Sequence, residues 1–240
     1  MFLRKIITAV PNTLTLCNLI SGCLACICAF SFDRTIGHVF GTDINGRQLA
    51  WILVGLAAVF DFFDGAASRW LHAPSPLGKE LDSLADLVSF GVAPSLLLYN
   101  ILQVCTGSWW IPFVAVFIPA MGALRLAKFN LDDSQATEFK GLPIPANAIF
   151  WIGYASMAYS GVETLVSPLW WIPVLLLESW LMISPLRLFS LKFKTWGWKG
   201  NQWRWLLIVT AIVLVSVMGV PGLMWLIVAY LLYGIAAGGK

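Results

Sequence analysis

The chain has 240 residues, of which 59% are hydrophobic and 11% are charged, and its formal net charge is +3. A soluble globular domain typically carries about 45–50% apolar and about 25% charged residues, so this composition excludes that class. Disordered and collagen-like chains are excluded as well, because they need polar or Gly-rich sequences. The basic residues are spread along the chain, which does not indicate a nucleic-acid partner. We predict an all-α, polytopic bundle of transmembrane helices.

Long apolar segments predict where the helices cross the membrane. A hydrocarbon core about 30 Å thick needs about 20 mostly apolar residues per helix. Residues 1–12 precede the first such segment and predict a short interfacial helix, with Arg4 and Lys5 near lipid phosphates. Gly219 and Pro221 favour a tight turn between the last two segments. About eight spans follow from this measure, over residues 13–32, 49–69, 82–104, 109–129, 143–160, 169–191, 203–219 and 220–238.

The basic residues predict the orientation of these spans. Lys and Arg accumulate in short cytoplasmic loops. With both termini on one side, all of the 15 Lys and Arg residues except Arg34 and Arg47 fall on that side. We therefore expect both termini to be cytoplasmic.

Four aspartates lie at the facing ends of the second and third predicted spans. A carboxylate in an apolar segment is costly, so each of these residues is a candidate for function. Asp61 and Asp64 are three residues apart, and Asp82 and Asp86 are four residues apart, so each pair shares one face of a helix. We expect the two pairs to face each other at the cytoplasmic ends of their spans.

The two pairs of aspartates, brought together by the loop between them, predict a metal site. Pro74 and Pro76 break this loop and are expected to turn the chain back. Unit charges about 4 Å apart repel by about 4 kcal/mol at an effective dielectric constant near 20, so converging carboxylates need cations. Oxygen ligands favour Mg²⁺ or Mn²⁺ over zinc, and Mg²⁺ is typically held together with substrate phosphates. Gly65 and Gly78 would let a phosphate approach the backbone, and Arg69 could contact it through two hydrogen bonds.

This stretch resembles the signature of the CDP-alcohol phosphotransferases, D-x-x-D-G-x-x-A-R followed by G-x-x-x-D-x-x-x-D. Ser68 stands where that family usually has Ala. The resemblance implies an enzyme that transfers a phosphatidyl group from a CDP-linked lipid to an alcohol and releases CMP. The residues that fill the signature are Asp61, Asp64, Gly65, Arg69, Gly78, Asp82 and Asp86.

Roles for these residues follow from the same resemblance. The four aspartates are expected to bind two Mg²⁺ or Mn²⁺ ions, and Asp86 is also expected to act as the general base. The pocket for CDP-diacylglycerol is expected to include Gly65, Arg69 and Gly78. A homodimer is implied as well.

Three further segments, residues 11–22, 125–130 and 139–148, look like those of the integral-membrane phosphatidylserine synthases of bacteria and archaea. Those enzymes use CDP-diacylglycerol and L-serine and lie in the cell (inner) membrane, and we expect the active site here to face the cytoplasm. Because the resemblance covers roughly residues 1–160, we divide a single membrane domain, 1–240, into the interfacial helix 1–12, a catalytic core 13–160 and additional spans 161–240.

The same segments supply candidate binding residues. Asn12 and Thr13 are expected in the CDP-diacylglycerol pocket. Serine carries a carboxylate, so its pocket should hold a cation. Uncharged Asn18 and Asn147, near the same side, can position the nucleotide or the acceptor. The candidates for acceptor binding are Arg125, Lys128, Asn130 and Lys140.

Two alternatives stay open. The first is a phosphatidyltransferase with another acceptor, such as glycerol 3-phosphate, inositol phosphate or choline. The second is a cation or proton transporter, in which clustered carboxylates form the ion pathway. The aspartates lie at one membrane face and no inverted repeat is visible in the sequence, and both features favour the transferase.

Overall fold

The computed structural model of the chain is predominantly helical, as the composition predicts. It describes residues 2–39, 41–72, 75–131, 139–157, 171–189, 197–198 and 200–237. The chain divides into two compact units, Met1–Asn100 and Ile101–Lys240. Each unit is described by itself below.

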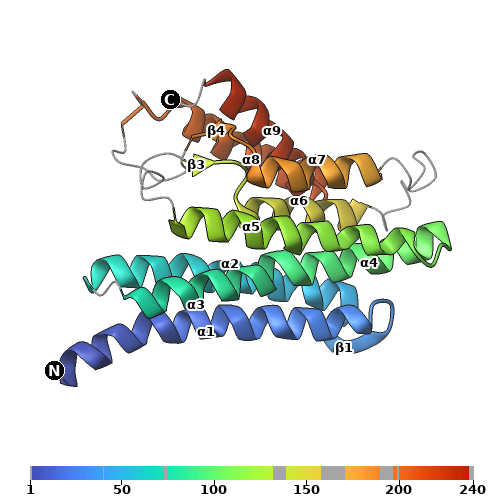
Figure 1. Ribbon diagram of the computed structural model, residues 1–240. Helices are drawn as coiled ribbons and strands as arrows, with labels where there is room; N and C mark the ends of the chain where they lie inside the picture. The colour runs from blue at the N-terminus through green and yellow to red at the C-terminus, as the bar shows by residue number, and fades with distance from the viewer. Residues whose placement is uncertain are drawn as a thin grey trace. The chain divides into compact units, whose positions relative to one another are not determined.

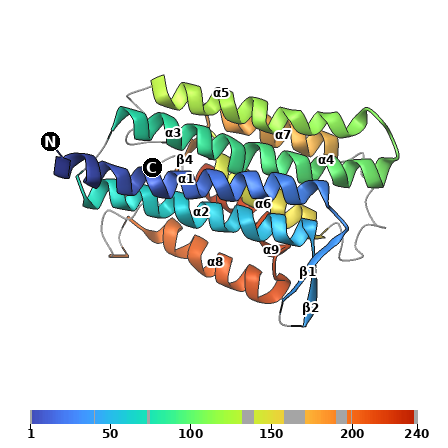
Figure 2. The ribbon, with the colours of Figure 1, turned by 90° about the horizontal axis from the view of Figure 1, so that it is seen from below.

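The first unit consists of long helices and a β-hairpin. α1 lies alongside both α2 and α3 (Figures 1 and 2). This arrangement puts the N-terminal helix next to the two helices that carry the four aspartates. The elements of the unit are α1 (Phe2–Phe30), β1 (Thr35–Val39), β2 (Thr42–Asn45), α2 (Gly46–Trp70), α3 (Pro76–Asp86), the π-helix η1 (Leu87–Val92) and the first part of α4 (Ala93–Thr106).

Small buried side chains allow α1 and α2 to approach closely. Ala25 and Ala29 on α1 are buried, as are Ala50, Val54 and Ala57 on α2. Their spacing of three or four residues puts each set on one helix face. Lipid offers membrane helices no hydrophobic drive to associate, so close packing of small residues is a main source of their attraction. This packing holds α1 against the helix that carries the first pair of aspartates.

A capping box explains why α2 begins at Gly46, before the predicted start at residue 49. Asn45 Oδ1 accepts a hydrogen bond from the Gln48 backbone N–H at 2.9 Å, and Gln48 Oε1 accepts one from the Asn45 N–H at 3.1 Å. Such reciprocal bonds satisfy N–H groups that a helix start leaves unpaired. The strands β1 and β2 that precede this cap form an antiparallel hairpin, which the apolar pattern did not predict.

The third span begins at Pro76 instead of residue 82, and this corrects the expectation that Pro76 breaks the loop. Ser75 caps the helix, because its Oγ accepts a hydrogen bond from the Gly78 N–H at 2.9 Å. Pro76 occupies the first turn, where the missing N–H of proline has no cost. Pro76 therefore starts α3, while Pro74 lies outside the described residues.

A π-helical turn interrupts the segment Pro76–Thr106, which is otherwise α-helical. Pro94 gives a local reason, because proline has no N–H and its ring crowds the carbonyl four residues earlier. In the π turn the N–H of Ala93 bonds to the Val88 carbonyl, five residues back. Ser89 of this turn donates to the backbone carbonyl of Asn18 at 3.0 Å, so the turn also contacts α1.

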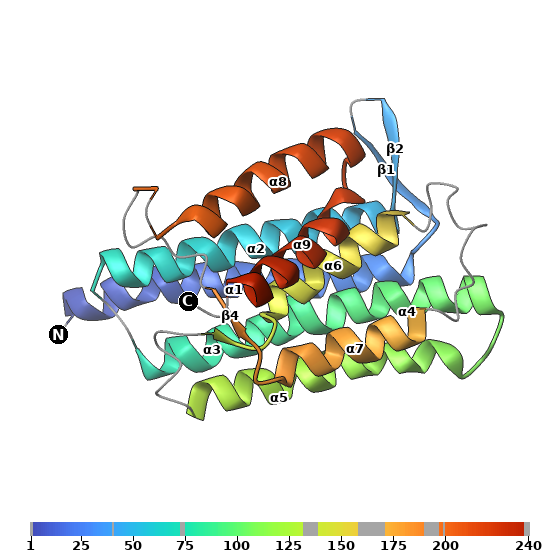
Figure 3. The ribbon, with the colours of Figure 1, turned by 90° about the horizontal axis from the view of Figure 1, so that it is seen from above.

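The second unit is built of shorter helices around an apolar interior. α9 lies against α6, and α7 lies beside α5 (Figure 3). Ile118, Trp151 and Leu175 are among the buried side chains that fill the interior. After the end of α4, its elements are η2 (Ile111–Val116), α5 (Phe117–Leu131), β3 (Phe139–Lys140), α6 (Ile144–Met157), α7 (Trp171–Ile183), β4 (Arg187–Leu188), α8 (Gln202–Met218) and α9 (Gly222–Ala236).

Each predicted span overlaps a helix of the structure. α1 continues through residue 12, so the predicted boundary between an interfacial helix and the first span is not seen. The turn predicted after α8 is confirmed, because Gly219 ends that helix with φ 67° and α9 begins at Gly222.

Membrane-spanning length is clearest in the first half of the chain. α7, α8 and α9 are apolar but shorter. These helices support an integral membrane bundle, while the number of spans and the side of the termini stay predictions. Among the described residues, four segments are long and apolar enough to cross a membrane, namely Ala9–Phe30, Gly46–Trp70, Pro76–Thr106 and Ile111–Leu131.

Candidate active site

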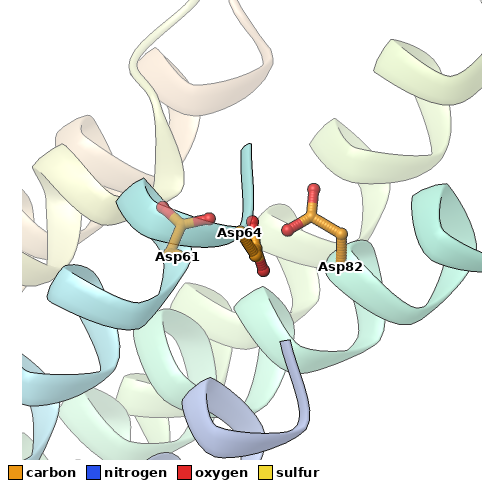
Figure 4. Close-up of side chains that lie close together, drawn as sticks. All are labelled: Asp61, Asp64 and Asp82. Atoms are coloured by element: carbon orange, nitrogen blue, oxygen red, sulfur yellow. The ribbon is translucent and has the colours of Figure 1, made fainter. Parts of the chain in front are cut away.

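Three aspartates from two helices meet in the first unit. Asp61 and Asp64 lie one turn apart on α2 and face Asp82 on α3 (Figure 4). One carboxylate oxygen from each residue lies within 4.8 Å of the other two. The pairing of positions i and i+3 that the sequence predicts on α2 is therefore used to present both carboxylates to the neighbouring helix.

The chemistry of this trio fits a divalent cation. Asp82 Oδ1 is buried and accepts no hydrogen bond from any described residue. The ion pairs found among the described residues, Asp33 with Arg47 and His38 with Asp43, do not involve the trio. Clustered carboxylates without a cationic side chain repel one another, and a hard cation with oxygen ligands removes that repulsion.

A cavity of about 230 Å³ opens beside the trio. Gly78 has no side chain, which lets its backbone lie close to the side chains of Ser75 and Asn12. A Cβ on Gly78 would lie 2.9 Å from Ser75 Oγ and 3.0 Å from Asn12 Oδ1. A cavity with clustered carboxylates on one wall has a composition that suits a phosphate or nucleotide held through a divalent cation. Its lining residues are Pro11, Asn12, Thr15, Asp64, Gly65, Ser68, Ser75, Gly78, Lys79 and Asp82.

Asp86 has different surroundings from the trio. It follows Asp82 by one turn and is the last residue of α3, and its side chain is not part of the group within 4.8 Å. It is buried and accepts a hydrogen bond from Asn18 Nδ2 on α1 at 3.3 Å. The expectation that all four carboxylates converge thus holds for three of them, and the fourth is engaged with α1.

Only some of the residues expected in the CDP-diacylglycerol pocket line the cavity. Asn12, Gly65 and Gly78 line the cavity. Arg69 is exposed at the end of α2 and does not line the cavity, although a Cβ on Gly65 would lie 3.4 Å from its Nη1. Thr13 instead is exposed and donates to the Ala9 carbonyl at 2.8 Å.

The residues expected to bind the acceptor lie in the second unit. Arg125 stacks over the Phe129 ring at 5.9 Å on α5, which also carries Lys128 and Asn130. Lys140 is in β3, and its side chain lies outside the described part. Their role in acceptor binding stays a prediction.

Three polar residues that line the cavity were not predicted from the sequence as site residues, namely Thr15, Ser75 and Lys79. For two of them, the sequence contains a pattern that could have predicted their place. Ser75 directly before Pro76 is a typical helix start. Thr15 and Asn18 are polar residues three positions apart in an apolar span, which is the same pattern that singled out Asp61 and Asp64.

Comparison with known proteins agrees with this site. A sequence profile of the CDP-alcohol phosphatidyltransferase family matches residues 8–184. The chain belongs to this family. The chain is an enzyme of this family, and the matched range contains all four aspartates and every residue that lines the cavity.

Relatives in the family carry a common name, CDP-diacylglycerol–serine O-phosphatidyltransferase. One from Bacillus subtilis (strain 168) is 39% identical over 140 residues, which is 57% of this chain and 69% of that protein. One from Methanocaldococcus jannaschii is 35% identical over 158 residues, 66% of this chain and 65% of that protein. One from Helicobacter pylori (strain 26695) is 30% identical over 229 residues, 94% of this chain and 89% of that protein.

Proposed function

We propose that this chain transfers the phosphatidyl group of CDP-diacylglycerol to the hydroxyl of L-serine, giving phosphatidylserine and CMP. The observation that carries the proposal is the aspartate trio beside a cavity, in a chain whose relatives are named for this reaction. An ion pathway would not need the glycine-lined cavity beside the trio, so the transferase accounts for more of the site.

The aspartates would hold the donor through metal. Asp61, Asp64 and Asp82 supply the ligand oxygens, with Asp86 as a further ligand, and Mg²⁺ or Mn²⁺ suits this all-oxygen set. When bound, two such ions neutralise the pyrophosphate and stabilise the attacking and leaving oxygens of an in-line displacement. The cavity beside them, lined by Asn12, Gly65 and Gly78, would receive the nucleotide part of the donor.

Asp86 would act as the general base. Its carboxylate takes the proton from the serine hydroxyl as that oxygen attacks the phosphorus that carries the diacylglycerol. A bond forms between the serine oxygen and this phosphorus, and the bond to the bridging oxygen of the CMP moiety breaks. The bridging oxygen leaves with CMP. A positioned carboxylate base typically contributes 10²–10⁴-fold to the rate.

Both substrates constrain where the site must lie. CDP-diacylglycerol keeps its acyl chains in the bilayer, while serine and CMP are water-soluble. A site at the cytoplasmic end of α2 and α3 meets both demands, and the distribution of Lys and Arg supports that orientation. The basic residues of α5, Arg125 and Lys128, are the proposed partners of the serine carboxylate.

An acceptor screen tests this function. Purified protein in detergent with CDP-diacylglycerol and Mg²⁺ or Mn²⁺ is offered labelled serine, glycerol 3-phosphate, inositol phosphate or choline. We expect labelled phosphatidylserine and stoichiometric CMP with serine alone. Transfer to another acceptor in place of serine would correct the acceptor and keep the reaction class, whereas CMP release from none of them would contradict the transferase.

A further inference from the structure

The aspartates have polar partners on α1 that lie outside the aspartate motif. Thr15 and Asn18 are three residues apart on this helix, so they share the face that meets α2 and α3. Their exposed fractions are 3% and 0%. A buried polar side chain in an apolar helix destabilises the fold unless it makes hydrogen bonds, so the bonds of these two residues call for an explanation.

Thr15 is hydrogen-bonded to Asp64, one of the three aspartates of the trio. Its Oγ1 lies 2.7 Å from Asp64 Oδ2 and 3.1 Å from the Pro11 carbonyl oxygen. A hydroxyl has one proton to donate. In a helix, Thr commonly bonds to the carbonyl four residues back, which here is Pro11. The shorter distance favours the carboxylate as the acceptor of this proton, as expected for a charge-assisted bond.

Asn18 is bonded to the fourth aspartate. Its Nδ2 donates to Asp86 Oδ1 at 3.3 Å, and its backbone carbonyl accepts from Ser89 Oγ at 3.0 Å. The second bond holds α1 against the π turn that follows Asp86. The backbone of Asn18 is thus held beside the turn that directly follows the carboxylate that its side chain contacts.

Stability alone does not explain Asn18. Its Oδ1 is buried and has no hydrogen-bond partner among the described residues. Turning the amide over would place this oxygen against the Asp86 carboxylate, so the orientation is set by Asp86. A leucine at this position would avoid the unpaired oxygen but would leave the buried Asp86 carboxylate without this donor, so the amide serves Asp86 and leaves one oxygen of its own unpaired.

From these contacts we infer that Thr15 and Asn18 are positioning residues of the active site, Thr15 for Asp64 and Asn18 for Asp86. Each donates the bond that selects one rotamer of its aspartate before substrate arrives. Side chains that orient metal ligands typically change metal affinity or activity by 10- to 100-fold when they are removed. The inference rests on the proposed function for the roles of the two aspartates, but its geometry does not involve the acceptor.

Mn²⁺ binding tests the role of Thr15. Wild-type protein and the variants Thr15→Val and Thr15→Ser are titrated with Mn²⁺ in detergent without substrate, and free Mn²⁺ is read by electron paramagnetic resonance. Valine keeps the shape and removes the hydroxyl, so we expect the dissociation constant to rise about 10-fold or more. Serine restores the hydroxyl and should bind within about threefold of wild type. Unchanged Mn²⁺ affinity in Thr15→Val would overturn the role.

Kinetics and unfolding test the role of Asn18. In Asn18→Leu we expect kcat to fall at least 10-fold, with KM for CDP-diacylglycerol within twofold of wild type, because Asp86 acts on the acceptor. The thermal unfolding midpoint is measured alongside, because leucine removes the unpaired oxygen but also takes the donor from the buried Asp86 carboxylate. A lower midpoint with unchanged kcat in the folded fraction would make Asn18 a purely structural residue.

Ser21→Ala is the matched control for both variants. Ser21 is buried on α1 three residues after Asn18, but its Oγ donates to the Cys17 carbonyl of the same helix at 2.8 Å. We expect Mn²⁺ affinity and kcat within twofold of wild type. Equal losses in Ser21→Ala would attribute the effects to α1 packing and contradict the inference. Transfer to an acceptor other than serine would correct the proposed function and leave the Mn²⁺ result standing, whereas a wild-type protein that binds no Mn²⁺ would contradict both.

Discussion

At the scale of single residues, Asp86 differs from the other three aspartates of the motif in what surrounds it. The trio is formed by carboxylates that face one another, whereas Asp86 faces an amide donor on α1. A carboxylate that shares less of the metal charge is the better proton acceptor, because cations lower the basicity of their ligands. We therefore propose a separation of roles, in which all four aspartates hold the ions and Asp86 alone takes the proton.

Replacing Asp86 tests this separation. Asp86→Asn keeps the size of the side chain and removes its ability to take a proton, so we expect kcat to fall by about 10²–10⁴-fold. Initial rates of CMP release at saturating CDP-diacylglycerol and serine measure the effect. The matched control is Asp82→Asn, which we expect to weaken Mn²⁺ binding as well. Undiminished turnover by Asp86→Asn would exclude it as the base.

At the scale of helices, the contact between α1 and the π turn holds the site together. Gly22 is buried against Ser89, and a Cβ on Gly22 would lie 2.7 Å from Ser89 Cα. No side chain larger than hydrogen fits at this distance, so the close approach of the two backbones depends on this glycine. The same approach brings Asn18 within hydrogen-bond reach of Asp86.

Adding one methyl group at Gly22 should therefore separate the helices. We expect Gly22→Ala to destabilise the protein by about 1–3 kcal/mol, the usual cost of overpacking, and to lower kcat because Asn18 moves away from Asp86. Thermal unfolding in detergent and initial rates measure the two effects. Gly55→Ala is the control, since a Cβ on this α2 residue would meet no atom within 4 Å. Equal stability of the two variants would show that α1 and η1 can separate freely.

At the scale of the whole molecule, the placement of charge predicts the orientation in the membrane. Arg34 lies between α1 and the β-hairpin, near the start of α2, while Glu80 lies on α3 beyond the end of α2. The positive-inside rule assigns Arg34 to the outer side and the loop between α2 and α3 to the cytoplasm. The two residues should therefore lie on opposite sides of the bilayer.

Cysteine labelling in cells measures this orientation. In a background with the five natural cysteines replaced, Arg34→Cys should react with a membrane-impermeant maleimide in intact cells. Glu80→Cys should react only after the cells are opened, because both residues are exposed but on different sides. The reverse pattern would place the aspartates outside the cell, away from the cytoplasm.

How much the sequence predicts depends on how local each signal is. The length of the apolar segments is enough to place the helices, because a span needs about 20 apolar residues. The spacing of Asp61 and Asp64 puts both side chains on one face, because residues three positions apart are neighbours on a helix surface. The start of α3 at Pro76 was missed although its signal, Ser75 followed by proline, is local too. The amphipathic pattern of residues 1–12 predicts a separate interfacial helix, whereas α1 runs unbroken through Pro11 into the first span.

The sequence by itself determined the membrane class, the helices and the motif that identifies the chemistry, because composition, periodicity and spacing act over a few turns. Only the tertiary structure decided that three aspartates meet while Asp86 turns to α1, and that Thr15 lines the cavity where Thr13 was expected. The bonds of Thr15 to Asp64 and of Asn18 to Asp86 join residues 49 and 68 positions apart. Such contacts depend on which faces two helices present to each other, and small buried residues such as Ala25 and Ala50 set those faces through packing that no local pattern encodes.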